Sequence, residues 1–400
     1  MKKPGLFAQL EPLQRKRLLT YAVTYFSVGI GVSLLGPILP FLAGQVSVTL
    51  GQISFAFTAQ NLGYLLGSVG GGWLYDRFPS HRLMVFSLCL MAVSGLVIPL
   101  VPWFYALLLI LFFFGLGLGV MDVGENLVLV WMFTSRVGPY LNALHFIFGT
   151  GAFFTPIIIT AIMGWTGGSL SWAIWALVLL FCPGLIGLTT LPSPREDPTE
   201  VVKEGVSQHF AGLILLLILL FFMAVGVQIG FSGWIFTYVS ELSIADPTAA
   251  SLMTSLFWGC LTLGRLVAVP ISRKVQPGTL VLFNCSILVV VMGLILIWPL
   301  SPAMLWAGSA GMGLGTSLIF PTLLSFAKTR LPMTGRVAGL FFLGSSLGMM
   351  VVPMLLGQVF DRLGGYAMML VLFAAALISL VIMVVLNSKR FSGKQGLQKI

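Results

Sequence analysis

The chain has 400 residues, of which 58% are hydrophobic and only 8% are charged, and its mean hydropathy is +1.05. This composition excludes a water-soluble globule, because so few polar side chains would not cover the surface of a protein of this size. The formal net charge is +10, which would suit an anionic partner, but its distribution along the chain argues for a different origin.

Twelve apolar runs of membrane-spanning length follow one another along the chain. Each has about 20 residues or more, enough to cross a bilayer as a helix. A helix satisfies its own backbone hydrogen bonds in lipid, so helices are the expected spanning elements. The runs cover approximately residues 18–43, 53–75, 82–102, 104–133, 138–164, 168–191, 210–239, 248–272, 278–299, 301–327, 333–360 and 366–387.

The basic residues lie in alternate connections between these runs, which is the positive-inside pattern. We therefore expect both termini to face the cytoplasm of a cell (inner) membrane, and we expect no nucleic-acid partner. The other side holds Arg362 alone, beside Asp361. The basic connections contain Lys2, Lys3, Arg15, Lys16, Arg17, Arg77, Arg82, Arg136, Arg195, Lys203, Arg273, Lys274, Lys328, Arg330, Arg336, Lys389, Arg390, Lys394 and Lys399.

Cysteine usage gives no sign of a cofactor or metal centre. The four cysteines lie inside predicted spans or at their edges, and no two of them form a CxxC pair. We interpret them as small apolar packing residues. We expect no cofactor and no bound metal, apart from a sodium ion if sodium is the coupling ion.

Glycines and prolines recur at one offset, 197 positions, on both sides of a polar stretch at 192–209. The pairs are Gly29 with Gly226, Gly36 with Gly233, Gly67 with Gly264, Pro156 with Pro353, and Gly167-Gly168 with Gly364-Gly365. The repeat predicts an all-α polytopic membrane protein with twelve transmembrane helices in two pseudo-symmetric six-helix bundles. We expect bundles at 1–191 and 210–387, a cytoplasmic linker at 192–209 and a basic tail at 388–400, with the solute site near the midplane between the bundles.

The connection between the second and third spans carries a charged motif. It reads Gly72-Trp-Leu-Tyr-Asp76-Arg77, and Arg82 follows; the equivalent point of the second half carries Arg273 and Lys274. The motif resembles that of the major facilitator superfamily, which implies the twelve-helix transporter fold. A carboxylate beside guanidinium groups is suited to a cytoplasmic gate, although the charges also serve as topology signals.

Two carboxylates lie deep in the fourth span. Asp122, Glu125 and Asn126 are three and four positions apart, so they share one helix face. An ionised side chain at the centre of a membrane helix costs roughly 2.5–3.5 kcal/mol. Such a pair shares a proton or binds a cation readily. We predict an ion-coupling site at Asp122 and Glu125, with sodium or a proton as the ion; the alternative is a hydrogen-bonded contact that only fixes helix packing.

The fifth span places Asn142 and His145 on one face, shortly after the turn from span four. Together with Asp122 and Asn126, this pattern resembles the fucose permease group. Residues 226–238 of span seven resemble the sodium-dependent glucose transporter type. The resemblance implies that Asp122 is the coupling carboxylate and that Asn126, Asn142 and His145 lie near the solute.

Amides and flat aromatic rings in other spans suit a neutral polyhydroxylated solute, whose rings stack while its hydroxyls form hydrogen bonds. Ordinary packing is the alternative for each aromatic residue. The further candidates are Gln60, Asn61, Gln228, Trp234, Tyr238 and Trp258.

We therefore predict a secondary active transporter with alternating access, acting as a monomer, that carries a sugar or similar small neutral polar solute by proton or sodium symport. A proton-coupled exporter or flippase of lipophilic drugs or lipids is the first alternative. A membrane sensor without transport is the second. The sequence carries no nucleophile, metalloprotease or nucleotide-binding motif that would indicate an enzyme.

Overall fold

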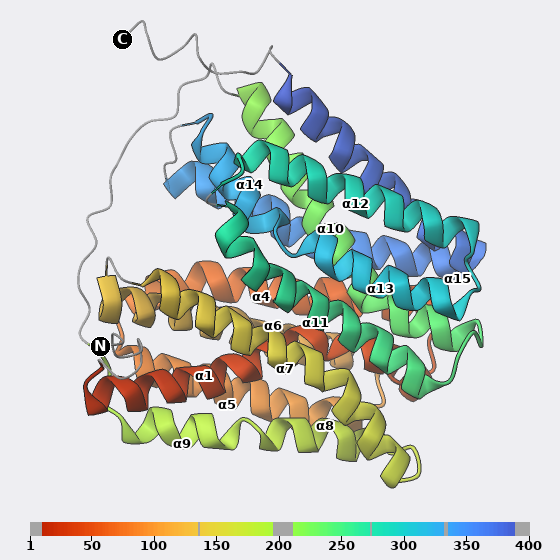
Figure 1. The fold of residues 1–400 in the computed structure, drawn as a ribbon. Coiled ribbons are helices and arrows are strands. Elements are labelled where there is room, and N and C mark those ends of the chain that lie inside the picture. Colours follow the sequence, from red (N-terminus) through yellow and green to blue (C-terminus); the bar gives the residue numbers. More distant parts are fainter. Residues whose placement is uncertain (1–9, 135–136, 195–210, 273, 332–334, 389–400) are drawn as a thin grey trace, which may run out of the picture. The chain divides into compact units, whose positions relative to one another are not determined.

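A computed structural model describes residues 10–134, 137–194, 211–272, 274–331 and 335–388. These residues form helices joined by short connections (Figure 1). The basic tail from 389 onward, most of the 192–209 linker, and the predicted topology or gate residues Lys2, Lys3, Arg136, Arg195, Lys203 and Arg273 lie outside the described residues. The helices are α1 Pro12–Ser33, α2 Leu35–Gln45, α3 Leu50–Ile53, α4 Phe55–Tyr75, α5 Ser80–Val97, the 3₁₀ turn η2 Ile98–Leu100, α6 Phe104–Phe133, α7 Gly138–Trp165, α8 Leu170–Leu179, α9 Cys182–Thr190, α10 Ala211–Glu241, α11 Pro247–Ser272, α12 Pro277–Ile297, α13 Pro302–Thr316, α14 Ile319–Lys328 and α15 Gly335–Asn387.

The predicted multi-span helical fold is confirmed. Within the described residues, nine helices are long and apolar enough to cross a membrane, or ten if the bent pair α1 and α2 counts as one span. One of them, α15, contains a non-helical Gly364 and corresponds to two predicted spans. With α15 counted twice and α4 added, the helices match the twelve predicted runs.

Prolines explain why three predicted spans are broken. A proline ring clashes with the carbonyl four residues earlier and removes one helical hydrogen bond. Counting back four residues from Pro37, Pro183 and Pro321 leads to the break between α1 and α2, the end of α8, and the break between α13 and α14. The axis bends by 50° between α1 and α2.

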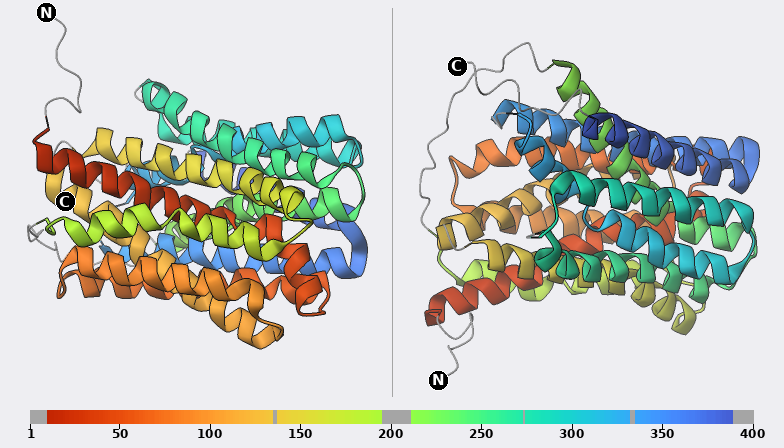
Figure 2. Two further views of the ribbon diagram at one scale, coloured as in Figure 1. Left: turned by 90° about the horizontal axis from the view of Figure 1, so that it is seen from below. Right: turned by 45° about the horizontal axis from the view of Figure 1, so that its top comes forward.

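Unit 1 is a compact group of helices formed by the described residues of 1–34 and 62–197. It contains α1, most of α4, and α5 to α9. In this unit α1 packs along α7, α5 packs along α6, and α9 lies beside both α1 and α5; Figures 1 and 2 show α8 and α9 running end to end beside α5. The side chains of Leu88, Phe114 and Leu118 are buried at its core.

Unit 2 is formed by residues 35–61 and the described residues of 198–400. Its helices pair as α10 with α15, α11 with α13, and α12 with α13, α14 and α15. The corner formed by α2 and α3 packs on α10 and α15, where the Ser54 hydroxyl donates to the carbonyl of Met354 at 3.0 Å. Residues 35–61, which precede the linker, thus pack with helices that follow it. The division into bundles at 1–191 and 210–387 stays a prediction.

The repeat is also visible in local backbone geometry. Gly167 and Gly364, which are paired in the sequence, have φ of 67° and 83°. Two serines that the sequence comparison did not single out, Ser47 and Ser243, have φ of 53° and 51°. Each follows a helix whose last carbonyls accept the same two backbone hydrogen bonds, from Ser47 and Val48 in one half and from Ser243 and Ile244 in the other. This is the Schellman ending of a helix, so the two halves share their turn chemistry as well as their spacing.

Candidate functional site

Asp122 on α6 lies at the centre of a polar cluster inside unit 1. Its Oδ1 accepts a hydrogen bond from the Tyr25 hydroxyl on α1 at 2.8 Å. Its Oδ2 accepts one from the Tyr64 hydroxyl on α4 at 2.6 Å. The Asp122 side chain is half-buried, whereas Tyr25 is buried. Both carboxylate oxygens therefore have a hydroxyl donor, which suits an ionised carboxylate.

Two of the predicted neighbours join this cluster. The Asn126 amide donates to the backbone carbonyl of Asp122 at 2.8 Å and reaches Oδ1 at 3.4 Å. The His145 ring on α7 lies edge-on to Tyr25, with Nδ1 3.3 Å from the Tyr25 hydroxyl. Asn142 is exposed on α7, one turn before His145. The structure therefore brings Asp122, Asn126 and His145 together through Tyr25, and leaves Asn142 at the edge of the group.

Glu125 occupies a different environment from Asp122, although it is only one turn away. Its side chain is fully buried. Oε1 contacts the Thr24 hydroxyl, which also lies within hydrogen-bond distance of the carbonyls of Thr20 and Tyr21. In the described part of the chain, Oε2 has no hydrogen-bond partner.

The Thr24 hydroxyl has too few hydrogens to satisfy all of its neighbours, which favours a neutral Glu125. A threonine hydroxyl has one hydrogen to donate, and two backbone carbonyls compete for it with Glu125. An ionised carboxylate that has only this shared donor in the described residues carries a large desolvation cost in a buried site, whereas a protonated acid can donate to the Thr24 oxygen. The two acids thus lie in different surroundings: Asp122 has two hydroxyl donors, and Glu125 has one hydroxyl contact that it shares with two backbone carbonyls.

Replacing Tyr64 with phenylalanine tests the hydroxyl support of Asp122. A hydrogen bond to a charged group contributes about 1.5–3 kcal/mol, so we expect Tyr64→Phe to lower the maximal rate of solute uptake by roughly tenfold or more. The reason is that Oδ2 of Asp122 loses the hydroxyl that donates to it, so the charged carboxylate is less well stabilised. Tyr105→Phe, at the exposed start of α6, the helix that carries Asp122, is the control and is expected to keep the wild-type rate. Equal rates for both variants would contradict the assignment.

The sequence profile of the Major Facilitator Superfamily matches residues 21–353. This match covers most of the chain and includes α1, α4, α6 and α7, which carry the polar cluster. The chain belongs to the Major Facilitator Superfamily. The predictions of a multi-pass membrane transporter, and of a protein that is not an enzyme, are confirmed with it.

Curated relatives cover nearly the whole chain. The sodium-dependent glucose transporter 1 of Danio rerio is 29% identical over 391 residues, which cover 88% of this chain and 66% of the relative. The chain thus spans just under two thirds of that relative's length. The major facilitator superfamily domain-containing protein 4A of Homo sapiens is 26% identical over 467 residues, covering 91% of this chain and 90% of the relative.

Solved structures share the superfamily fold at low sequence identity. A crystal structure of the nucleoside transporter NupG superposes with a TM-score of 0.76 at 12% identity, covering 92% of this chain and 98% of that one. The D-xylose-proton symporter gives a TM-score of 0.73 at 11% identity, covering 94% and 98%. At these identities the likeness concerns the fold alone.

The other predicted solute residues lie in unit 2. Trp234 and Tyr238 are fully buried, and their polar atoms donate to the carbonyls of Pro353 and Pro299, both at 2.9 Å. Trp258 is buried against Phe257. In the described conformation these three rings occupy packing positions.

The amide side chains that we predicted to bind the solute differ in how deeply they are buried. Asn61 is buried and donates to the carbonyls of Phe57 and Met349. Gln60 is also buried. Gln228 on α10 is half-buried. Gln228 is therefore the most accessible of these amides in unit 2.

The superfamily loop motif lies at the end of α4 and the start of α5. Gly72 is half-buried, Asp76 is exposed, and the Arg77 guanidinium lies 3.8 Å from the centre of the Trp73 ring. Among the described residues of unit 1, no ion pair joins Asp76 to Arg77 or Arg82. Lys274 is exposed at the end of α11. The gate at these residues stays a prediction.

Sequence reasoning missed three residues of the cluster: Tyr25, Tyr64 and Thr24. Tyr64 follows Asn61 by three positions and Gln60 by four, which places it on the polar face of its span. That spacing was a usable signal. Tyr25 and Thr24 gave none, because a tyrosine or threonine in a span is common and only the packing of α1 on α6 and α7 shows what they contact.

Proposed function

We propose that the protein is a secondary active transporter that moves a sugar or similar small neutral polar solute by symport with a proton or a sodium ion. Relatives named as sodium-dependent glucose transporters support the solute class and ion coupling. The fold shared with the D-xylose-proton symporter is consistent with this proposal. We further propose a monomer in the cell (inner) membrane, with both termini in the cytoplasm, on the basis of the charge distribution.

The single observation that carries the proposal is the Asp122 carboxylate, held between the hydroxyls of Tyr25 and Tyr64. A carboxylate at the middle of a membrane helix is costly, and this one is half-buried rather than sealed. A proton or sodium ion that reaches it removes the charge. If the two access states of the transporter differ in how well they tolerate the charge, neutralisation shifts the equilibrium between them.

We propose that the solute binds near the same residues. The Asn126 amide and the His145 ring offer hydrogen-bond donors and acceptors within one or two side-chain contacts of Asp122. The Tyr25 hydroxyl that donates to Asp122 also lies near Asn126 and His145. A hydroxylated solute that bonds to Asn126 and His145 would therefore compete with Asp122 for this hydroxyl. We propose that this sharing links solute binding to ion binding, which is the coupling that symport requires.

Flux measurements in proteoliposomes test the proposal. We expect labelled glucose or another hexose to accumulate when an inward sodium gradient or an inward proton gradient is imposed. The gradient that supports accumulation identifies the ion. If lipophilic cations rather than sugars dissipate the gradient, the exporter alternative holds instead. Binding of a solute without saturable counterflow would favour a sensor.

Replacing Glu125 with glutamine is expected to have a small effect on uptake. Glutamine has the shape of a protonated glutamic acid and can donate to the Thr24 oxygen, so we expect uptake rates within about threefold of wild type, equivalent to less than 1 kcal/mol. Glu125→Ala removes the contact with Thr24 and leaves a buried void. It serves as the disruptive comparison and is expected to reduce the amount of folded protein. Loss of coupled uptake in Glu125→Gln, with normal folding, would show that Glu125 itself exchanges the ion.

A further inference from the structure

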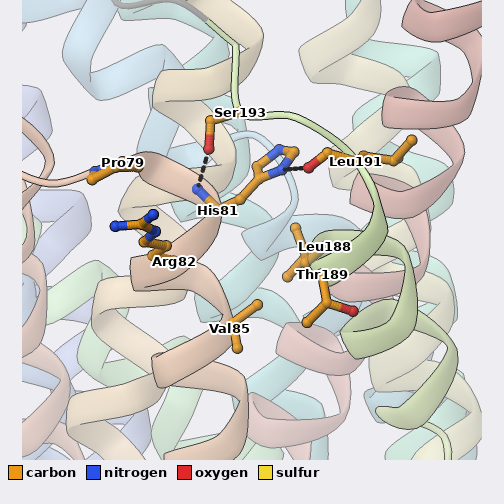
Figure 3. A pocket seen from close by; sticks show the side chains of 8 residues that line it. All are labelled: Pro79, His81, Arg82, Val85, Leu188, Thr189, Leu191 and Ser193. Atoms are coloured by element: carbon orange, nitrogen blue, oxygen red, sulfur yellow. Dashed lines mark hydrogen bonds between the residues drawn. The ribbon is translucent and has the colours of Figure 1, made fainter.

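Two cavities lie in sequence along one seam of unit 1, where α5 packs beside α9 and α8. The first has a volume of about 480 Å³ and lies at the start of α5 and the end of α9 (Figure 3). The second has a volume of about 230 Å³ and lies further along α5, beside the break between α8 and α9. Neither includes a residue of the Asp122 cluster.

The first cavity is polar and positively charged. Of the residues that line it, Arg82 carries a full positive charge, and none is acidic. Arg82 is exposed, and in the described part of the chain its guanidinium makes no hydrogen bond or ion pair. Ser193 accepts a hydrogen bond from the His81 backbone N–H at 3.2 Å (Figure 3). The Ser193 hydroxyl hydrogen is therefore still available to a ligand.

His81 fixes the shape of the first cavity and is not available to a ligand. Its ring bonds to the Tyr21 hydroxyl at 2.7 Å through Nε2 and to the Leu191 carbonyl at 2.9 Å through Nδ1. In the connection that follows α9, the carbonyls of Pro192 and Ser193 accept hydrogen bonds from the Arg17 guanidinium. The end of α9 is thus tied to both α1 and α5, and the cavity is part of the folded unit.

The second cavity is apolar. It is lined by aliphatic and aromatic side chains, among them Leu88, Ala92, Leu185 and Phe181. The Trp175 indole N–H donates to the Leu96 carbonyl at 3.0 Å and joins α8 to α5 at the far end. An opening with these walls on a membrane helix offers hydrocarbon surface rather than hydrogen bonds.

The two cavities follow one another along both helices. Along α5 the lining passes from Val85 in the first cavity to Leu88 in the second, and along α9 from Leu188 to Leu185. Each step is less than one helical turn. From Arg82 to Ala92 the helix rises roughly 15 Å, which is about half the hydrocarbon thickness of a bilayer. That is the depth reached by a lipid tail whose phosphate lies at the membrane surface.

We propose that the α5/α9 seam is a binding site for one anionic phospholipid. Its phosphate lies in the first cavity against Arg82 and Ser193, and one acyl chain lies in the second cavity against Leu88 and Ala92. Charge complementarity selects an anionic headgroup, because the cavity offers a cation and a hydroxyl and no acid. The start of α5 lies on the side that we propose to be cytoplasmic, where anionic lipids attract basic residues.

Native mass spectrometry of the whole protein, released from nanodiscs with equal amounts of phosphatidylglycerol and phosphatidylcholine of the same chain length, tests the proposal. We expect one retained lipid, with phosphatidylglycerol preferred by about fivefold, the ratio that corresponds to about 1 kcal/mol per basic residue near an anionic surface. Arg82→Gln is expected to remove this preference. Equal retention of both lipids by the wild-type protein would overturn the charged part of the site.

Variants of the apolar cavity test the acyl chain separately. Ala92→Phe fills the second cavity and is expected to lower retention of both lipids at least fivefold. Val93→Phe makes the same change one residue further, where the side chain is exposed and outside the cavity, and is expected to retain lipid like the wild type. Equal loss in both variants, or no loss in either, would overturn the site.

Thermal unfolding in detergent separates a lipid from free phosphate. We expect phosphatidylglycerol to raise the melting temperature of the wild-type protein but not of Ala92→Phe. Inorganic phosphate and glycerophosphate are expected to give no increase at the same concentration. An equal increase with inorganic phosphate would show that the first cavity binds a free anion, and the lipid assignment would be wrong.

Discussion

Replacing Asp122 with asparagine is expected to abolish solute accumulation while leaving exchange of solute across the membrane. Asparagine keeps the shape of aspartate and an acceptor for one of the two tyrosine hydroxyls, Tyr25 and Tyr64, but it has no charge for the ion to neutralise. A membrane potential of 100 mV supplies about 2.3 kcal/mol per elementary charge, which supports roughly 50-fold accumulation. Without coupling, the solute reaches only equal concentrations on the two sides.

The measurement is uptake of a labelled sugar into proteoliposomes, with and without the imposed ion gradient, followed by counterflow in the absence of a gradient. Asp246→Asn is the matched control. It makes the same chemical change at an exposed position between α10 and α11, where the Asp246 side chain caps the next helix by accepting from the Ala249 N–H. Asparagine keeps that cap, so this control is expected to accumulate solute normally.

Accumulation by Asp122→Asn at the wild-type level would end the coupling assignment, whatever the solute. Loss of both accumulation and counterflow, with the protein folded, would assign Asp122 to solute binding rather than to ion coupling. The contrast with Glu125→Gln is informative, because both variants remove one carboxyl group from the same helix. Opposite outcomes are expected since Asp122 has two hydroxyl donors and Glu125 has one contact shared with backbone carbonyls.

The positions of the spans could be predicted because hydropathy and length are properties of a local stretch of sequence. The bends within the spans were not predicted, although Pro37, Pro183 and Pro321 carry the signal. Proline alone is ambiguous, since Pro156 and Pro353 lie inside helices that continue through them. Whether a helix breaks at a proline depends on the neighbours that compensate the lost hydrogen bond, and those are not visible in the sequence.

The polar cluster was partly predictable for a similar reason. Asp122 and Glu125 were identified because a carboxylate in a span is costly wherever the helix faces. Their different environments were not predictable, because they depend on which helices pack on each face of α6. For the three aromatic candidates Trp234, Tyr238 and Trp258, the residue type did not predict the role. An aromatic residue serves equally well in packing and in solute binding, so residue type alone does not separate the two.

The structure gives a physical reason for the glycine repeat, which is that glycines allow helix backbones to approach closely. In unit 1, a Cβ on Gly29 would clash with the Phe148 carbonyl, and one on Gly151 would clash with the Phe26 carbonyl. In unit 2, Gly348 stands 197 positions after Gly151, and a Cβ on it would clash with the Phe222 carbonyl in the same way. The crossings of α1 with α7 and of α10 with α15 are therefore close backbone contacts, which require glycine.

Gly151→Ala and Gly348→Ala are accordingly expected to destabilise the fold by about 3 kcal/mol or more, near the upper end of the usual cost of overpacking. The added methyl group meets a backbone oxygen, which cannot rotate away as a side chain would, so the two helices must separate along the whole crossing. This loss exceeds the gain of up to about 1 kcal/mol that alanine brings to a helix over glycine. The measurement is the melting temperature and the fraction of monodisperse protein in detergent.

Each helix contains its own control for this prediction. Gly164 lies on α7 with Gly151, and Gly339 lies on α15 with Gly348; a Cβ at either control position meets no atom within 4 Å. Gly164→Ala and Gly339→Ala are therefore expected to be neutral or slightly stabilising, because they gain helix propensity without a clash. If the crossing variants melted at the same temperature as these controls, the helices would not approach as closely as the structure indicates. If only one of the two crossing variants lost stability, the glycines would recur in both halves, but the close backbone contact would be present in only one of them.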